Sequence, residues 1–196
     1  MDTLEERIDS YNLFAFIFLT LPDEKFINNI LSLDLPDGMG EGISHLKYFI
    51  DKSRDADINE LLAAISVDRT YLIRGLTQSG PRPPYESVYV NHAAHEIIGQ
   101  LNVTYAEIGY SIAEGVHEPS DYIGVELSFM KELCVRELET SDENMRTLQK
   151  AFFEKHLGRW AQDLAREFIT KAQTDLYRAI GYMLNDFINE ERSNLS

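Results

Sequence analysis

The chain has 196 residues, of which 44% are hydrophobic and 11% aromatic, a composition typical of a globular protein that is long enough to bury a core. Its 33 acidic residues outnumber the 18 basic ones and give a formal net charge of −15. That balance argues against binding to a nucleic-acid backbone and is compatible with attraction of a cationic partner.

The cysteine count and the N-terminus indicate an intracellular protein. A single cysteine, Cys134, can form neither a disulfide framework nor a thiolate metal site, and it is expected to be buried as a small apolar residue. Acidic residues stand where a signal peptide carries basic ones, and the apolar run from Leu13 to Leu19 is far shorter than the roughly 20 residues that span a bilayer. We therefore expect a cytoplasmic chain without stable membrane insertion.

Apolar residues recur at helical spacing along most of the chain. The first helix is expected to open with a capping box from Thr3 to Glu6 and to end at Pro22. Two further capping boxes are predicted at 57–60 and 140–143, and Gly75 is predicted to end the helix that begins at the first of them. The later helices are expected at 26–33, at 43–50, from 57 to about 75, at 91–114, from 119 to about 139, from 140 to about 156, at 159–170 and at 172–190.

The helical pattern stops between Ser79 and Tyr89. Three prolines in four positions, at 81, 83 and 84, exclude a helix there and favour an extended backbone. Tyr85 and Tyr89 follow the prolines and are spaced to share one face if a helical turn follows.

A second interruption, a corner near the middle of the chain, lies between Gly115 and Tyr122. Gly115 is expected to end the preceding helix, and Pro119 is expected in the first turn of the next, where its missing N–H has no cost. Glu118 and Asp121 would then lie beside the positive end of the helix dipole. Such a corner is either a well-capped helix–helix turn or part of a binding site.

These patterns predict an all-α fold. We expect a single helical globule of about eight to ten helices, because no alternating apolar pattern with turn dipeptides indicates a sheet. Two lobes would meet at a hinge near 115–122, with an N-terminal helical lobe at 1–116 and a C-terminal helical lobe at 117–196 in one compact domain overall.

The sequence lacks the motifs of common enzymes. It contains no Gly-rich phosphate loop, no dinucleotide fingerprint and no Ser-centred elbow. His92, His95 and Glu96 come nearest to a metal motif, but their order differs from the His-Glu-x-x-His pattern of zinc proteases. His156 and Trp160, four residues apart, are expected to pack on each other. We therefore expect neither catalysis nor a metal or cofactor.

Three segments of the sequence, taken together, form a pattern specific enough to compare with a known protein family. They are Leu72–Gly75 with the proline break and Pro84–Tyr89; Glu118–Tyr122 continuing to Glu126–Phe129; and Phe152–Trp160. In this order and spacing, in an all-helical chain of this length, they resemble the TorD/DmsD family of molybdoenzyme-specific (redox enzyme maturation) chaperones. The family's corner usually reads Glu-Pro-x-Asp-His, and Tyr122 stands at the His position here. Ile73 stands where Phe is usual, followed by the charged Arg74.

The resemblance implies a cytoplasmic prokaryotic chaperone that is not an enzyme. Such a protein binds the twin-arginine signal peptide, the apo form of the catalytic subunit of a molybdopterin oxidoreductase, or both. It assists cofactor insertion and delays export until the enzyme is mature. The resemblance also implies a monomer or a domain-swapped homodimer.

A twin-arginine signal peptide has a cationic head and an apolar middle, so its receptor needs carboxylates beside an apolar groove. The acids predicted for the arginines are Glu118, Asp121 and Glu86. The residues predicted to line the groove are Leu72, Leu76, Pro83, Pro84, Tyr85, Tyr89 and Tyr122, and Pro119 is a further predicted contact of the peptide. This requires the proline break and the corner to meet in space; otherwise the acids are helix caps and the tyrosines are core.

Two alternatives come from other functional classes. One is a GTP-responsive switch, which the absence of a phosphate loop and the net charge of −15 both oppose. The other is a structural assembly subunit of a membrane-associated reductase complex, which an acidic helical globule also fits.

Overall fold

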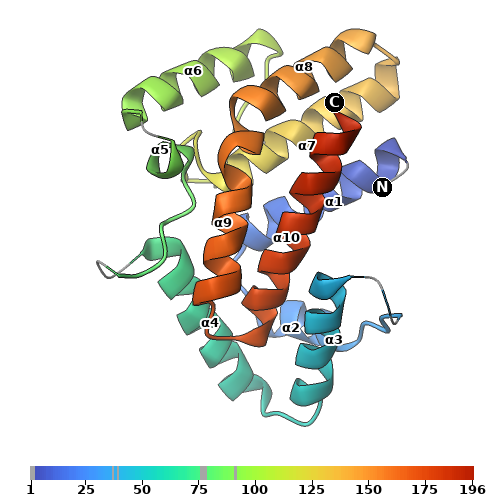
Figure 1. Cartoon of the computed structure of the whole chain (residues 1–196), viewed down its shortest axis with the longest axis vertical. Coiled ribbons are helices and arrows are strands. Elements are labelled where there is room, and N and C mark those ends of the chain that lie inside the picture. Colours follow the sequence, from blue (N-terminus) through green and yellow to red (C-terminus); the bar gives the residue numbers. More distant parts are fainter. Residues whose placement is uncertain (1–2, 37, 39, 76–78, 91) are drawn as a thin grey trace. The chain divides into compact units, whose positions relative to one another are not determined.

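A computed structural model of the chain describes residues 3–36, 38, 40–75, 79–90 and 92–196. Within these residues the structure is all-α and has no strand, as the sequence predicts (Figure 1). Its helices are α1 (Leu4–Leu19), α2 (Glu24–Leu31), α3 (Glu41–Ser53), α4 (Ile58–Arg74), α5 (Glu86–Tyr89), α6 (Ala94–Glu107), α7 (Ile123–Thr140), α8 (Glu143–Lys155), α9 (Leu157–Lys171) and α10 (Asp175–Asn194).

The chain forms two compact units, each assembled from segments that are distant in sequence. Unit 1 comprises Met1–Thr20, Pro84–Ala161 and Phe187–Ser196. Unit 2 comprises Leu21–Pro83 and Gln162–Asp186. The division into lobes at 1–116 and 117–196 stays a prediction; residues on both sides of 115–122 belong to unit 1.

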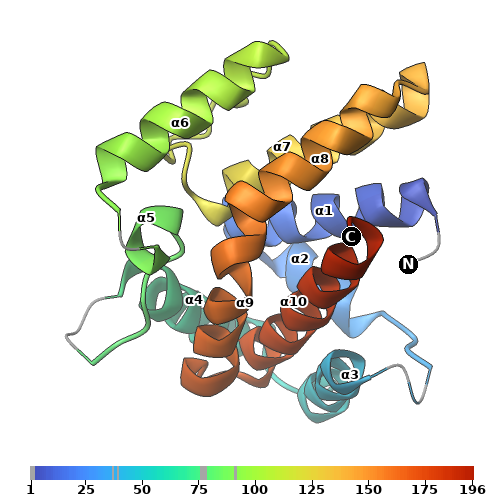
Figure 2. The ribbon, with the colours of Figure 1, turned by 45° about the horizontal axis from the view of Figure 1, so that its top comes forward.

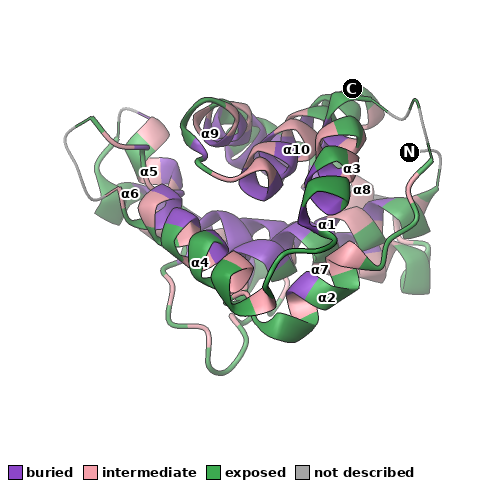
Figure 3. Ribbon diagram, turned by 90° about the horizontal axis from the view of Figure 1, so that it is seen from below, coloured by how far each residue is buried: buried purple, intermediate pink, exposed green. Residues whose placement is uncertain are grey.

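Helix α7 is the central element of unit 1. It packs against α1, and α8 runs beside it (Figure 2). The first three turns of α7 are almost continuously buried, so apolar side chains face more than one neighbour (Figure 3). Cys134 lies on this helix and is fully buried, as predicted. Burial raises the pKa of its thiol to about 12, so the thiol stays protonated.

Caps that depend on neighbouring residues form where the sequence predicts them. Thr3 and Glu6 make the expected capping box at the start of α1. The side chain of Asp57 caps α4, and Gly75 ends that helix with φ +57°, a left-handed conformation that favours glycine. A Cβ at Gly75 would also lie 2.8 Å from the Pro81 carbonyl oxygen. Both the left-handed conformation and this close approach therefore favour glycine at the end of α4.

The predicted capping box at 140–143 is wrong. Thr140 is the last residue of α7, and Ser141 adopts a left-handed conformation with φ +53°. The cap of α8 is Asp142, whose side chain accepts a hydrogen bond of 2.9 Å from the Asn144 N–H. The connection between α7 and α8 is so short that Thr140, the predicted N-cap residue of α8, is instead the last residue of α7.

The helix boundaries around the corner also differ from the prediction. Helix α6 ends at Glu107 instead of 114, so Gly115, with φ +87°, turns an irregular segment and ends no helix. Helix α7 begins only at Ile123, so Pro119 lies before the helix and not in its first turn. Tyr122 is the N-cap residue and makes no side-chain capping bond.

One buried ion pair joins the two ends of the chain in unit 1. The Arg7 guanidinium on α1 donates to both carboxylate oxygens of Glu191 on α10, at 2.7 and 2.8 Å. Gln149 accepts a third bond from Arg7, and the Tyr11 hydroxyl donates to Glu191 at 2.6 Å. Burial acts to raise the pKa of Glu191, but the hydrogen bond and charge of Arg7 outweigh it and hold the pKa below its ordinary value of 4.5.

In unit 2 a buried carboxylate caps a helix from another element. Asp68 on α4 accepts hydrogen bonds from the N–H groups of Gln173 and Thr174, immediately before α10. It also accepts a bond from the Thr174 hydroxyl at 2.7 Å. A negative charge at a helix N-terminus is favourable, so Asp68 fixes where α10 begins.

None of the helices within the described residues has the length and apolar character needed to cross a membrane.

We expect Glu191→Ala to lower the free energy of unfolding by roughly 3–5 kcal/mol, because it leaves the Arg7 charge buried without its partner. Urea unfolding at pH 7 measures the loss, and Glu154→Ala, an exposed site on α8, is the control. The pKa of Glu191 is lowered, so its contribution is complete above about pH 4.5 and is lost as the pH falls through the folded value. A loss at pH 7 no larger than that of the control would contradict the structural role of the pair.

Candidate functional site

The end of the proline break and the corner meet in unit 1. Tyr85 and Tyr122 form an isolated antiparallel β-bridge. On either side of it, the Glu86 N–H donates to the Asp121 carbonyl at 2.8 Å and the Ile123 N–H donates to the Pro84 carbonyl at 3.0 Å. We call residues 84–87 and 118–123 the knitted corner. The spatial condition on which the predicted site depends is therefore met for these residues.

Local sequence explains this pairing in part. The prolines keep the approach to the corner extended, and Pro84 has no N–H to satisfy, so it can offer its carbonyl alone. The Ile123 amide is one of the N–H groups that a helix start leaves without an intrahelical partner. Pro84 supplies that partner from outside the helix, which replaces the capping side chain that Tyr122 cannot provide.

Glu118 and Tyr85 form the rim of the knitted corner. Both are partly exposed, and the Tyr85 hydroxyl donates to Glu118 Oε2 at 2.9 Å. The Tyr85 ring lies against the buried ring of Tyr122, with 5.4 Å between centroids, and Pro119 is exposed beside them. This part of the site presents an oriented carboxylate next to aromatic and proline surface.

Asp121 faces inward. It is 2% exposed, and its Oδ2 accepts a 2.6 Å bond from the Ser87 hydroxyl and a longer one from the Ser87 N–H. Its carboxylate therefore stabilises the first turn of the short helix α5 from across the corner. Asp121 directly precedes Tyr122, the N-cap residue of α7, as expected, but its carboxylate bonds to the start of α5.

Glu86 is completely buried and pairs with His156. The two side chains are 2.9 Å apart, Oε2 to Nδ1, although 70 residues separate them in sequence. The expectation that His156 merely packs on Trp160 missed this bond. Both residues lie in the segments that carry the family resemblance, and that was the available signal. Spacing within a helix could not reveal a partner from another element.

A third buried carboxylate, Glu126, lies below the corner on α7. Its Oε2 accepts a 3.3 Å bond from the Trp160 indole N–H. Burial raises the pKa of Glu126 well above its ordinary value, and the charges of Glu86 and Asp121 raise it further. Glu126 lies in one of the three segments that carry the family resemblance, but its pattern in the sequence predicts no role for it.

Tyr122, at the family's usual His position, is a structural residue here. Its side chain is 1% exposed, and its hydroxyl donates to the Phe18 carbonyl at 2.9 Å. That carbonyl belongs to the last turn of α1. A phenol in this place therefore fastens α1 to the corner.

The remaining predicted contacts divide between the two units. Pro84 is buried in the corner, and Tyr89 is half-buried with its ring 5.2 Å from that of Trp160. Leu72 is fully buried and Pro83 half-buried, both within unit 2. Leu76 lies outside the described residues. Pro84, Tyr85 and Tyr122 therefore lie together in unit 1, whereas a peptide groove that also includes Leu72, Leu76 and Pro83 stays a prediction.

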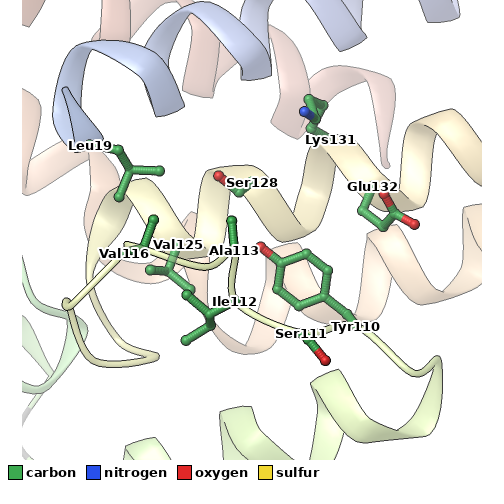
Figure 4. A pocket seen from close by; sticks show the side chains of 10 residues that line it. All are labelled: Leu19, Tyr110, Ser111, Ile112, Ala113, Val116, Val125, Ser128, Lys131 and Glu132. Atoms are coloured by element: carbon green, nitrogen blue, oxygen red, sulfur yellow. The ribbon is translucent and has the colours of Figure 1, made fainter.

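Unit 1 also contains two small pockets that none of the predicted contacts line. One, of about 170 Å³, lies where Tyr110, Ile112, Ala113 and Val116 reach over α7, with Leu19 of α1 at one end (Figure 4). The other, of about 150 Å³, is lined by residues that include Ile108, Phe129, Phe152 and His156. In the part of the chain that the structure describes, no group of three or more His, Cys, Asp or Glu side chains is arranged to hold a metal ion.

Comparison with known proteins identifies the family. The model of the family described as "Nitrate reductase delta subunit" matches residues 33–166. The chain belongs to this family. It is also 24% identical over 198 residues to a protein named "Chaperone protein TorD" from Vibrio parahaemolyticus serotype O3:K6 (strain RIMD 2210633), which covers 93% of this chain and 91% of that relative. The resemblance to the TorD/DmsD family is thereby confirmed.

Tyr122→Phe tests the structural role of the phenol. Removing the hydroxyl removes its hydrogen bond to the Phe18 carbonyl, so we expect a loss of about 1 kcal/mol in the free energy of unfolding. Chemical denaturation measures it, and Tyr48→Phe is the matched control because Tyr48 is 56% exposed. Equal stability of the two variants would show that the Tyr122–Phe18 bond contributes nothing.

Proposed function

We propose that this protein is a maturation chaperone for a molybdopterin oxidoreductase. It binds the twin-arginine signal peptide or the apo form of the catalytic subunit, assists cofactor insertion and delays export until the subunit is mature. Its action precedes export and therefore takes place in the cytoplasm. The observation that carries the proposal is family membership across 33–166, together with similarity along nearly the whole chain to a relative named a chaperone.

The knitted corner supports a specific place for the signal peptide. Glu118, Tyr85 and Tyr89 are partly exposed and Pro119 is exposed, so a peptide can reach them. Glu86, Asp121 and Tyr122 are buried and hydrogen bonded within the protein. In this proposal the first group contacts the peptide, and the second holds the contacting residues in position.

Glu118 is the best placed acid for a guanidinium. The bond from Tyr85 orients its carboxylate, and an ionised carboxylate suits the paired N–H donors of an arginine. The formal charge of −15 adds a long-range attraction that speeds the encounter with a cationic leader. The aromatic and proline surface beside Glu118 suits the apolar residues that follow the arginines in the signal peptide.

We expect Glu118→Gln to weaken binding of an Arg-Arg signal peptide by roughly tenfold to a hundredfold, since it removes a charge-assisted bond. Titration at low and high salt should show the larger effect at low salt. A Lys-Lys peptide should lose less, because lysine cannot form the bidentate fork. Glu139→Gln, an exposed acid at the end of α7, is the control.

Two more variants complete the test of the site. Tyr89→Ala removes apolar contact, and Asp121→Ala removes the support of α5 through Ser87. Unchanged affinity of Glu118→Gln, Tyr89→Ala and Asp121→Ala at both salt concentrations would exclude the knitted corner as the peptide site. Capture of the client by the same variants would then leave the chaperone function standing with its site elsewhere.

A structural subunit at fixed stoichiometry is the second candidate, because the family is described as "Nitrate reductase delta subunit". The two functions differ in what is retained. A chaperone co-purifies with the cofactor-free catalytic subunit and leaves the mature enzyme, whereas a structural subunit remains at fixed stoichiometry. Affinity purification of the mature reductase from its native host distinguishes them.

A further inference from the structure

The pocket of about 170 Å³ beneath residues 110–116 adjoins the knitted corner on more than one side. Val116, which lines it, stands two residues before Glu118 in the chain. Val125, which also lines it, donates its N–H to the Tyr122 carbonyl at 2.9 Å. The pocket and the proposed peptide site are therefore neighbouring parts of unit 1.

The corner also holds one wall of this pocket in place. Leu19 lines the pocket and directly follows Phe18, whose carbonyl accepts the hydrogen bond from the Tyr122 hydroxyl. A Cβ at Gly124 would lie 2.7 Å from Leu19 Cγ, so glycine at this position leaves room for the leucine side chain against α7. Leu19 is therefore positioned by the corner and by the first turn of α7.

The pocket has the size and the lining for one large apolar side chain. Its lining includes Leu19, Ile112, Val116, Val125 and the exposed Ala113 (Figure 4). Leu19, Ile112 and Val116 are only half-buried, so the space can be reached from solvent. An apolar cavity of about 150 Å³ accommodates a benzene ring. An aromatic or branched aliphatic side chain therefore fits, whereas a charged one would lose its hydration there.

Charges at the two ends of the pocket favour one direction for a bound peptide. Glu118 belongs to the corner, beside the start of α7. Lys131 lines the pocket six residues beyond Val125 on the same helix, which places it about 9 Å farther along the helix axis (Figure 4). The adjacent Glu132 pairs with Arg136 at 2.7 Å, so its charge is compensated. A cationic head is thus attracted to Glu118 and repelled by Lys131.

We propose that this space is a specificity pocket for the signal peptide, which takes an apolar side chain that follows the arginines while Glu118 holds an arginine. The Cα atoms of Val116 and Glu118 are at most about 7 Å apart, because two residues span no more than that. An extended peptide covers the same span with two residues, so the apolar side chain stands about two positions after the bound arginine. The inference rests on the proposed function and gives the peptide an apolar contact within unit 1, independent of Leu72, Leu76 and Pro83.

The test uses the full chain and two synthetic Arg-Arg signal peptides, one with phenylalanine and one with alanine two positions after the second arginine. Wild type should bind the phenylalanine peptide roughly tenfold to a hundredfold more tightly, as expected for burial of one large apolar side chain. Ala113→Phe puts a ring at the pocket from an exposed, non-helical position and should remove this preference. Ala106→Phe, at an exposed site on α6 that does not line the pocket, is the matched control and should keep it.

An NMR measurement on wild type decides the question even if Ala113→Phe does not fold. The ring of the bound phenylalanine peptide should show nuclear Overhauser effects to methyl groups of Leu19, Val116 and Val125. Equal affinity of wild type for both peptides, a preference that survives in Ala113→Phe, or effects to other methyl groups alone would each overturn the inference.

The same measurements separate this inference from the proposed function. If the pocket fails the test but Glu118→Gln still weakens binding of both peptides, the proposed function stands and the specificity pocket is excluded. If wild type binds neither peptide, signal-peptide binding itself is contradicted, and the inference falls with it.

Discussion

Pairing between two short extended segments is the constraint on which the corner of unit 1 depends. Two backbone hydrogen bonds join residues 84–86 to residues 121–123, and they satisfy amides at the starts of α5 and α7. Neither helix start has a capping side chain of its own. Because the caps are supplied by the pairing, both helix boundaries and the directions of the nearby carboxylates follow from it.

That constraint sorts the acids of the site by what they can do. Glu86, Asp121 and Glu126 point into the protein, where each one accepts a bond from another segment. Glu118 alone among the predicted acids remains partly exposed, with its carboxylate oriented by Tyr85. A receptor for a cationic leader needs both kinds, since an exposed acid binds well only when its surroundings are already ordered.

The sequence predicts this structure well where the forces are local. Helical periodicity gave the fold class, and Thr3, Asp57 and Gly75 act where they were expected because their hydrogen bonds span only a few residues. Prediction from the sequence failed at the corner, because the partners of Glu86 are distant in sequence. Asp121 lies 35 residues away and His156 lies 70 residues away. The local preference of proline for the first turn of a helix predicted a helix start at Pro119. The tertiary pairing overrides this preference, and α7 begins only at Ile123.

The tyrosine at position 122 connects these observations. It stands where the family usually has a histidine, so the titratable imidazole is absent from this position. Its hydroxyl instead fastens α1 to the corner through Phe18. The buried carboxylates nearby are bonded to another part of the chain, Glu86 to His156 and Glu126 to the Trp160 indole, so the pairing of the two extended segments is surrounded by polar contacts that reach across the sequence.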